Sequence, residues 1–182
     1  RLGNSYKLMK KAGMACAKII SAYSKKKNFV VVCGPGNNGG DGFVISNYLK
    51  KYKKKVNLYC LKKKLYKKDA LKAYRKNKLK KFNLKKLSIK KNYLIVDCLF
   101  GIGLNKPIKG VYKETILKIN KSKAKVISID MPSGIYGNNG KVMGSAIKAN
   151  LTLALHAMKK GHNLYPGNKH SGKIKIVDIG IK

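Results

Sequence analysis

The sequence predicts an α/β fold, in which a mostly parallel sheet carries helices on both of its faces. Short apolar runs such as 29–33 and 94–98 are continuous and rich in β-branched residues, as parallel strands buried on both faces are. These runs alternate along the chain with segments whose apolar residues recur at helical spacing. No internal repeat or linker interrupts this alternation, so residues 1–182 are interpreted as a single domain.

The first half of the chain opens with a helix. Its apolar residues recur at helical spacing from Leu8 to Ile20, and Ser5 is a suitable cap. The elements expected next are strand 29–33, a glycine-rich turn leading into helix 42–52, strand 56–61 and helix 69–78.

The second half continues the alternation. The segment 94–98 is a clear strand, whereas 84–89 is ambiguous and is expected at most as a short strand. Apolar residues at helical spacing predict a helix over 111–119. The last strands are expected over 126–130, 151–155 and 174–179, with a mostly irregular segment between the final two.

The chain is strongly basic, and the type of basic residue decides how the charge is interpreted. Its 43 Lys and Arg against 6 Asp and Glu give a net charge of +37, which ordinarily suggests nucleic-acid binding. However, only Arg1 and Arg75 are arginines, and recognition of base edges favours the planar fork of Arg. We therefore attribute the charge mainly to the compositional bias of an AT-rich genome. It is still expected to attract anionic ligands in a salt-dependent way.

Composition also indicates the compartment. The four cysteines lie inside apolar patterns without a C-x-x-C pair, which is typical of buried thiols in a reducing, cytoplasmic environment. No apolar run approaches the ~18 residues of a membrane span. The histidines His156, His162 and His170 lack zinc-like spacing. The chain begins at Arg1 within a helical pattern, so a short N-terminal piece is expected to be missing.

Three of the six acidic residues follow or end apolar runs. Asp41 lies in the glycine-rich turn, Asp97 lies at the end of strand 94–98, and Asp130 closes the next strand. Ligands of parallel α/β sheets bind at the carboxyl ends of the strands, so these acids are expected to share one site.

The glycine-rich turn matches a dinucleotide-binding fingerprint. It contains G-x-G-x-x-G as Gly34, Gly36 and Gly39, between a strand and a helix. Glycines let the backbone approach a phosphate, and the helix N-terminus offers free N–H groups. Two Asn and one Asp in the same turn add amide and carboxylate groups, which are unusual for a plain Rossmann turn.

Oxygen donors at the same strand ends indicate a cation. Asn38, Asp97 and Ser133 supply hard oxygens, which suit Na⁺, K⁺, Ca²⁺ or Mg²⁺ rather than zinc. Because few carboxylates are available, a cation of low charge is favoured.

Three motifs carry a specific resemblance to a known family. The segments VCGPGNNGGDG (32–42), VDCLFGIGL (96–104) and SIDMPSGI (128–135) resemble the signatures of the NAD(P)H-hydrate epimerase family, also called the YjeF N-terminal domain. The similarity is collinear from about Leu8 to Lys182 and is supported at 9–13, 157–161, 166–167 and 177–180. One departure is Lys10, which stands where the family usually has Glu, and the upstream part of the first helix is lacking.

The resemblance implies a Rossmann-like, three-layer α/β/α fold and a metabolite-repair activity. The family is an isomerase that interconverts the R and S forms of hydrated NADH and NADPH (NADHX and NADPHX) at C6, so that a partner dehydratase can restore the cofactor. It implies one epimerase domain over 1–182, without the dehydratase domain of fused members, and a homodimer.

The same resemblance implies the site residues. A potassium ion would be held by Asn38, Asp97 and Ser133, in agreement with the argument from oxygen donors. The hydrated dinucleotide would contact Asn37, Asn38, Gly39, Gly40, Asp41, Gly101, Ile102, Gly103, Leu104, Asn105, Lys106, Pro107 and Asp130.

Asp130 is the candidate catalytic acid/base, because it lies at a strand end inside a motif expected to bind the ligand. Asp41 is the alternative, although Asp in a glycine-rich turn often organises the turn itself. Lys159 is a weaker candidate, for contact with a phosphate.

Three other functions remain open at this point. A catalytically silent nucleotide-binding module would keep the same glycine-rich turn. An NAD-dependent oxidoreductase would need an acid for the ribose near 56–61, where the sequence has none. A nucleic-acid binder would show steeply salt-dependent affinity that survives loss of Asp97 and Ser133.

Overall fold

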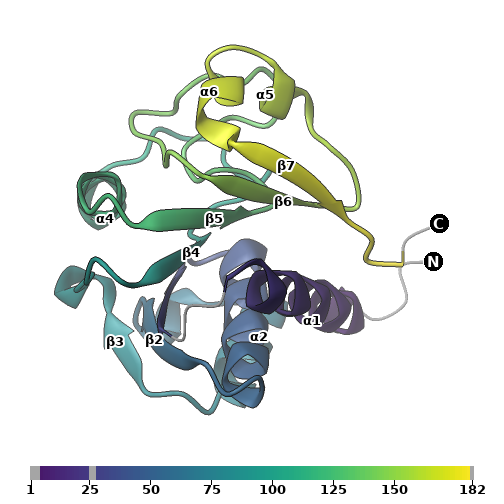
Figure 1. Cartoon of the computed structure of the whole chain (residues 1–182), viewed down its shortest axis with the longest axis vertical. Helices are drawn as coiled ribbons and strands as arrows, with labels where there is room; N and C mark the ends of the chain where they lie inside the picture. The colour runs from purple at the N-terminus through teal and green to yellow at the C-terminus, as the bar shows by residue number, and fades with distance from the viewer. Residues whose placement is uncertain (1–4, 25–27, 181–182) are drawn as a thin grey trace.

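The computed structural model describes residues 5–24 and 28–180, and its strands form one sheet in which every pairing is parallel. The strands lie side by side in the order β3-β2-β1-β4-β5-β6-β7 (Figure 1). Their bounds are β1 Asn28–Cys33, β2 Lys55–Cys60, β3 Lys81–Asn83, β4 Leu94–Cys98, β5 Lys125–Ile129, β6 Leu151–Leu155 and β7 Lys173–Val177. The α/β class is confirmed, and the sheet is wholly rather than mostly parallel.

The order of the strands reverses between β1 and β4, and this reversal creates a place for a ligand. The chain builds outward from β1 to β2 and β3, then returns to add β4 to β7 on the other side. The register pairs Cys33 with Cys98, so β1 and β4 end level with one another. Beyond such neighbouring ends, the connections leave toward opposite faces and open a crevice.

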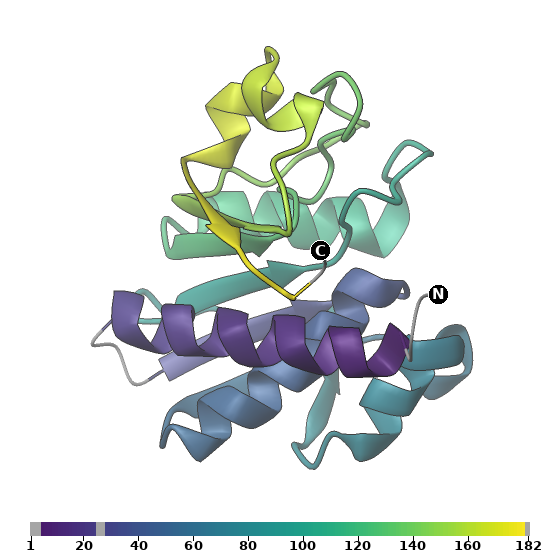
Figure 2. The ribbon, with the colours of Figure 1, turned by 90° about the vertical axis from the view of Figure 1, so that its right-hand side faces the viewer.

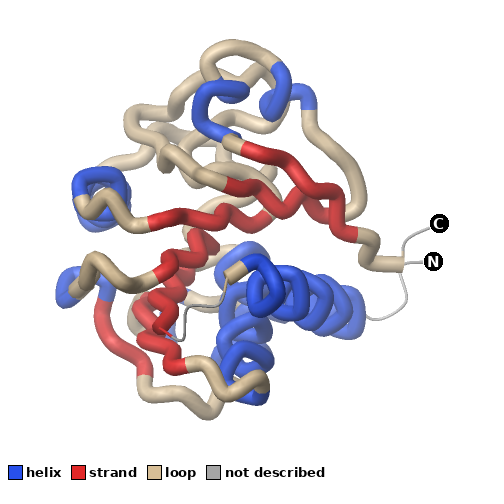
Figure 3. The backbone as a smooth tube through the Cα atoms, viewed as in Figure 1, coloured by secondary structure: helices blue, strands red, loops and turns tan. Residues whose placement is uncertain are grey.

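The helices cover both faces of the sheet and produce three layers. Figure 2 shows α1 running across one face, and Figure 3 shows helices on both sides of the strands. The helices of that face are α1 (Ser5–Tyr23), α2 (Asn37–Lys51) and α3 (Lys68–Lys76), and the opposite face carries α4 (Gly110–Lys121). Within residues 5–24 and 28–180, no helix is both long and apolar enough to cross a membrane.

The sheet has a hydrophobic core on each face, and alternate residues of each central strand pack into one core or the other. Phe29, Val31 and Cys33 of β1 pack toward α1, α2 and α3, whereas Val30 and Val32 pack toward α4, and all five are fully buried. Burial on both faces explains why the strand sequences are continuously apolar rather than alternating. The four cysteines are buried free thiols of this interior, as the sequence predicts.

Local expectations were wrong at three places. Helix α2 begins at Asn37, five residues before the expected start, because packing overrides the low helix propensity of its glycines. The strand sought at 84–89 lies upstream, at Lys81–Asn83, and the 3₁₀ turn Leu84–Lys86 follows it. The irregular segment before β7 contains two short helices, α5 (Lys160–Asn163) and α6 (Gly167–Ser171). Ser5 is the first residue of α1, and its hydroxyl donates to the Asp69 carboxylate.

The glycines of the fingerprint are needed for close approach rather than for an unusual backbone. Neither Gly34 nor Gly39 has a positive φ. A Cβ at Gly39 would lie 1.9 Å from the carbonyl oxygen of Gly34, and a Cβ at Gly34 would lie 1.8 Å from the carbonyl oxygen of Leu99. The first turn of α2 therefore rests on the backbone that leaves β1, which in turn rests on the backbone that leaves β4.

Replacing Gly39 by Ala is expected to destabilise the protein by about 2–3 kcal/mol, because the new methyl group meets backbone that cannot move aside. This is opposite to the stabilisation of ~1 kcal/mol that Gly→Ala normally gives inside a helix. Urea unfolding followed by circular dichroism measures the difference.

The matched control is Gly40→Ala in the same helix. Its Cβ would first meet the end of the flexible Met9 side chain, at 2.5 Å, so a smaller loss is expected. Equal effects of the two substitutions would contradict the close-approach explanation.

Candidate functional site

A cleft of about 610 Å³ lies at the carboxyl edge of the sheet, where β1, β4, β5 and β6 end. This volume is in the range of small-molecule sites. The residues that line it come from the start of α2, from the loop after β4 and from the chain that follows β5 and β6. They are Pro35, Gly36, Asn37, Asn38, Asp41, Leu99, Phe100, Gly101, Ile102, Gly103, Leu104, Asp130, Leu155, His156, Lys159 and Ile179.

The predicted site residues divide between this cleft and its surroundings. Those that line it are Asn37, Asn38, Asp41, Gly101, Ile102, Gly103, Leu104 and Asp130. Gly39 and Gly40 are buried in the first turns of α2, behind the lining. Asn105, Lys106 and Pro107 are exposed beyond the end of the lining loop. The sequence analysis did not assign Leu155, His156 or Ile179 to the site.

Helix α2 presents its N-terminus to the cleft. Gly36 precedes the helix, and Asn37, Asn38 and Asp41 occupy its first turns. The first N–H groups of a helix lack intrahelical acceptors, so this end favours an anionic group such as a phosphate. The glycine-rich segment of the predicted fingerprint is thus a helix start rather than a free-standing turn.

Asp130 is the residue after β5, and it has a left-handed backbone with a φ of +66°. Its N–H donates to the carbonyl of Leu153 (2.8 Å), and the N–H of Met131 donates to the carbonyl of Ile129 (2.9 Å). The second bond closes a strained γ-turn around Asp130. The carboxylate faces the cleft, where Oδ2 accepts from the N–H of Ile102 at 3.0 Å.

Strand β6 ends in the same way. His156 has a φ of +65°, its N–H donates to the carbonyl of Val177 (2.9 Å), and the N–H of Ala157 donates to the carbonyl of Leu155 (2.8 Å). Two neighbouring strands therefore finish in γ-turns whose central residues, Asp130 and His156, both line the cleft.

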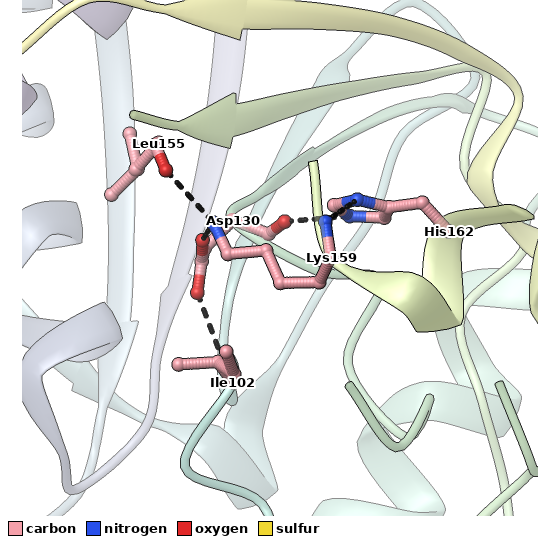
Figure 4. Close-up of polar contacts among 5 residues, drawn as sticks. All are labelled: Ile102, Asp130, Leu155, Lys159 and His162. Atoms are coloured by element: carbon pink, nitrogen blue, oxygen red, sulfur yellow. Dashed lines mark hydrogen bonds and ion pairs between the residues drawn. The ribbon is translucent and has the colours of Figure 1, made fainter. Parts of the chain in front are cut away.

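Lys159 forms an ion pair with Asp130 Oδ1, and its ammonium also donates to the carbonyl of Leu155 at 2.8 Å (Figure 4). Both charged side chains are nearly buried, with 13% and 11% of their areas exposed. Contact of Lys159 with a phosphate stays a prediction, and its ammonium is engaged by these two partners. The only sequence signal for this residue was the resemblance of 157–161 to a family loop.

Asp97 is fully buried, and its carboxylate accepts four hydrogen bonds. Oδ1 accepts from the Leu99 N–H (3.2 Å) and the Ser133 hydroxyl (2.6 Å). Oδ2 accepts from the Ser128 hydroxyl (2.8 Å) and the Ser133 N–H (2.9 Å). Burial raises the pKa of Asp97, and the four bonds act against this rise.

The predicted cation ligands lie near the cleft, and their chemistry fits a monovalent cation. Asn38 is 7% exposed, and both polar atoms of its amide are buried without a partner among the described residues. The Ser133 hydroxyl has two acceptors in reach, Asp97 Oδ1 at 2.6 Å and the Phe100 carbonyl at 3.2 Å. If the Ser133 hydroxyl turned its proton from Asp97 Oδ1 to the Phe100 carbonyl, lone pairs of the Asp97 and Ser133 oxygens would be free to face a cation. Residues 5–24 and 28–180 contain no cluster of three His, Cys, Asp or Glu side chains of the kind that holds a multivalent metal.

Asp41 is buried in α2 with 8% of its surface exposed. Burial raises the pKa of Asp41 well above its ordinary value, and the nearby negative charge of Asp130 raises it further. The sequence analysis placed these two acids in one site, and both line the same cleft.

A second hollow of about 500 Å³ lies among α1, α2 and α3. It is lined by Tyr6, Lys10, Val44, Asn47, Tyr48, Lys50, Lys51, Ala73, Lys76 and Lys78. None of the predicted site residues is among them. Lys10, the departure noted in the sequence, lies here with its ammonium 5.7 Å from the centre of the Tyr6 ring.

Comparison with known proteins gives consistent results. Residues 5–161 match the family described as YjeF-related protein N-terminus. The chain is 35% identical to an NAD(P)H-hydrate epimerase of Weissella koreensis, over 96% of the chain and 80% of that protein. It is 32% identical to the enzyme of the same name from Oenococcus oeni, over 96% of the chain and 85% of that protein.

Two further matches bear on length and fold. A bifunctional NAD(P)H-hydrate repair enzyme Nnr of Thermofilum pendens is 33% identical over 94% of the chain, and the chain spans only 35% of that protein. The crystal structure of yeast ynu0 superimposes with a TM-score of 0.72 at 22% identity, over 93% of the chain and 76% of the yeast chain. This likeness confirms the Rossmann-like α/β/α fold.

Replacing Asp41 by Asn is expected to stabilise the protein at neutral pH by about 1–3 kcal/mol relative to the wild type. The folded state holds the Asp41 proton more tightly than the unfolded state does. The wild type therefore loses stability as the pH rises from the ordinary Asp pKa toward the raised one, and the neutral variant does not.

Urea unfolding at a series of pH values from 4 to 8, without potassium, measures this gap, which is the difference in the free energy of unfolding between Asp41→Asn and the wild type. Asp178→Asn is the control, because it makes the same charge change at an exposed position. A gap that stays constant with pH, or that Asp178→Asn reproduces, would exclude a raised pKa at Asp41.

Proposed function

The chain belongs to the family of YjeF-related protein N-termini, and from this membership we propose that it is an NAD(P)H-hydrate epimerase. Its substrates would be hydrated NADH and NADPH, and its reaction would be inversion at C6 of the damaged nicotinamide ring. The observation that carries the proposal is the ion pair of Asp130 and Lys159 on the wall of a cleft that also receives the N-terminus of α2.

The reaction needs a proton donor and a proton acceptor at one carbon. C6 bears both the added hydroxyl and the ring nitrogen. Protonation of the hydroxyl lets water leave with the C–O bonding electrons, while the nitrogen lone pair forms the C6=N iminium bond. Water then adds to the opposite face and loses a proton, which gives the other epimer.

The ion pair offers both proton-transfer groups side by side. In the proposed mechanism, the Lys159 ammonium gives a proton to the departing hydroxyl, and the Asp130 carboxylate takes one from the returning water. In the reverse reaction the roles are exchanged: protonated Asp130 gives its proton to the departing hydroxyl, and the neutral Lys159 amine takes one from the returning water. After either direction, proton transfer within the pair restores the carboxylate and the ammonium. A carboxylate in the cleft also stabilises the positive charge of the iminium.

The start of α2 suits the other end of the substrate. Its first N–H groups attract phosphate oxygens, and Asn37 offers an exposed amide beside them. The loop 101–104 contributes mainly backbone and apolar surface, on which a flat ring can lie. The cleft therefore offers an anion-binding end and a proton-transfer end.

A monovalent cation, potassium, is proposed as a second ligand. Asn38, Asp97 and Ser133 would hold it, and the unpartnered buried amide of Asn38 supports this assignment. When bound, the ion supplies a fixed positive charge near the start of α2, which favours the pyrophosphate of a dinucleotide.

A dehydratase partner, a homodimer and a cytoplasmic location are part of the same proposal. The bifunctional relatives of Thermofilum pendens and Coxiella burnetii support a functional link to a dehydratase that completes the repair. A homodimer is proposed from the family resemblance. The buried free thiols support a cytoplasmic location.

Asp130→Asn is expected to lower kcat for epimerisation by about 10²-fold or more, because the amide cannot take a proton. Asn tolerates the left-handed backbone, so the fold should persist. The measurement follows the interconversion of purified hydrated NADH epimers by chromatography. Lys159→Met should lower kcat comparably, whereas Lys160→Met, at the exposed neighbouring position, should not.

The same assay separates the competing functions. An inactive wild type that still binds the dinucleotide would support the silent binding module. Epimerisation by Asp130→Asn at the wild-type rate, with unchanged binding, would remove Asp130 from the mechanism.

Potassium is expected to raise the Tm of the wild type by about 2–4 °C relative to tetramethylammonium at equal ionic strength, which corresponds to roughly 1 kcal/mol of binding linkage. Asn38→Ala should abolish this rise, because it removes the buried amide. Asn37→Ala changes the exposed neighbouring amide and should retain it. A rise of the same size in Asn38→Ala would contradict the assignment.

A further inference from the structure

The ion pair of Asp130 and Lys159 joins the ends of two neighbouring strands, since Asp130 follows β5 and Lys159 lies beyond the end of β6. Asp130 closes β5, whereas Lys159 immediately precedes the short helix α5. Long side chains such as Lys lose rotamer freedom when they are fixed in one geometry. Proton transfer in a defined direction therefore needs something that holds the two main chains in register.

His162 contacts the main chain of both partners. Its Nδ1 accepts from the N–H of Lys159 at 3.0 Å, and its Nε2 lies 2.8 Å from the carbonyl oxygen of Asp130 (Figure 4). Since a carbonyl can only accept, Nε2 carries the proton, and since Nδ1 accepts, the ring is neutral. One imidazole thus spans the backbone of the acid and the backbone of the lysine.

The surroundings of His162 support this role. The side chain is 1% exposed and does not line the cleft, so it does not touch a bound ligand. Burial lowers the pKa of His162, the Asp130 carbonyl acts against this effect, and the nearby Lys159 charge adds to it. The neutral form that the hydrogen bonds require is therefore the form that its environment favours.

The hydrogen bond from His162 is made to the carbonyl of Asp130, the residue whose backbone is strained. Asp130 has a positive φ, which is unfavourable for a residue with a Cβ unless neighbouring groups compensate. Its N–H is bonded to Leu153 of β6, and its carbonyl is bonded to His162. Without the second bond, the main chain of Asp130 is held from one side only, and the register between the carboxylate and Lys159 depends on their side chains alone.

We propose that His162 is a positioning residue for epimerisation, which holds the Asp130 carboxylate and the Lys159 ammonium in register by bridging their main chains. This inference rests on the proposed function for its effect on rate. It predicts that kcat depends on the donor to the Asp130 carbonyl, whereas KM does not.

Two substitutions of His162 separate the two halves of the bridge. The amide oxygen of His162→Asn occupies the place of Nδ1 and can still accept from the Lys159 N–H, but the side chain is too short to reach the Asp130 carbonyl. The amide nitrogen of His162→Gln extends to the position of Nε2 and can still donate. We expect kcat to fall about tenfold in the Asn variant and to stay within about threefold of the wild type in the Gln variant, with KM unchanged in both.

The matched control is His170→Asn. His170 is half-buried, and its Nδ1 lies 2.9 Å from the carbonyl of Ile147, but it does not line the cleft or contact Asp130. This variant should lose some thermal stability without losing kcat. Equal kcat in the Asn and Gln variants of His162 would overturn the proposal and leave His162 as a purely structural residue.

A second measurement does not depend on turnover. The ¹³C resonance of the Asp130 carboxyl, followed by NMR, reports its surroundings even if the protein is inactive. It should shift in His162→Asn and stay in place in His162→Gln and His170→Asn. An inactive wild type with this pattern would reject the proposed function but keep the bridge, whereas an unshifted resonance in His162→Asn would reject the bridge itself.

Discussion

The buried carboxylate of Asp97 fixes the geometry on which the rest of the site depends. Its four hydrogen bonds join the loop after β4, the strand β5 and the turn after β5. An isolated charge in this interior would be strongly disfavoured, so the donors of Leu99, Ser128 and Ser133 are held around it with little freedom. Because Phe100 also donates to the Ser133 hydroxyl, the loop that carries Gly101 and Ile102 is tied to the segment that carries Asp130. The walls of the cleft are therefore assembled around one central acid.

The three acids of the site have distinct environments, and the differences suit distinct tasks. Asp97 is surrounded by neutral donors and is structural as well as a candidate cation ligand. Asp130 faces an ammonium and a backbone N–H at the edge of the cleft. Asp41 lies deeper, where burial and the charge of Asp130 both favour its protonated form. A site that must exchange protons benefits when neighbouring carboxyls differ in this way.

The sequence predicted the parts of this arrangement that follow from strand order. Asp97 and Asp130 end parallel strands, and the ends of parallel strands meet at one edge, so their convergence required no knowledge of loops. The start of α2 was misplaced because Gly39 and Gly40 have low helix propensity, and only the backbone packing beneath them makes the helix favourable there. The contacts of Lys159 and His162 with Asp130 were beyond sequence reasoning for a different reason. The two residues reach Asp130 from about 30 residues away, at the start of the short helix α5, and nothing distinguishes one lysine among so many until the chain is folded.

The γ-turns that end β5 and β6 also restrict which residues can occupy these positions. Among residues with a Cβ, Asp, Asn and His adopt the left-handed backbone most readily, and Asp and His are the two found here. Glu is the obvious chemical substitute for a catalytic Asp, but it is poorly suited to this backbone and would displace the carboxyl by one carbon. Asn and Gly also suit this backbone in place of Asp130, and neither carries a proton-transfer group. Drift to either residue would therefore silence the activity while leaving the fold intact, so inactive descendants of such a domain should be recognisable from this one position.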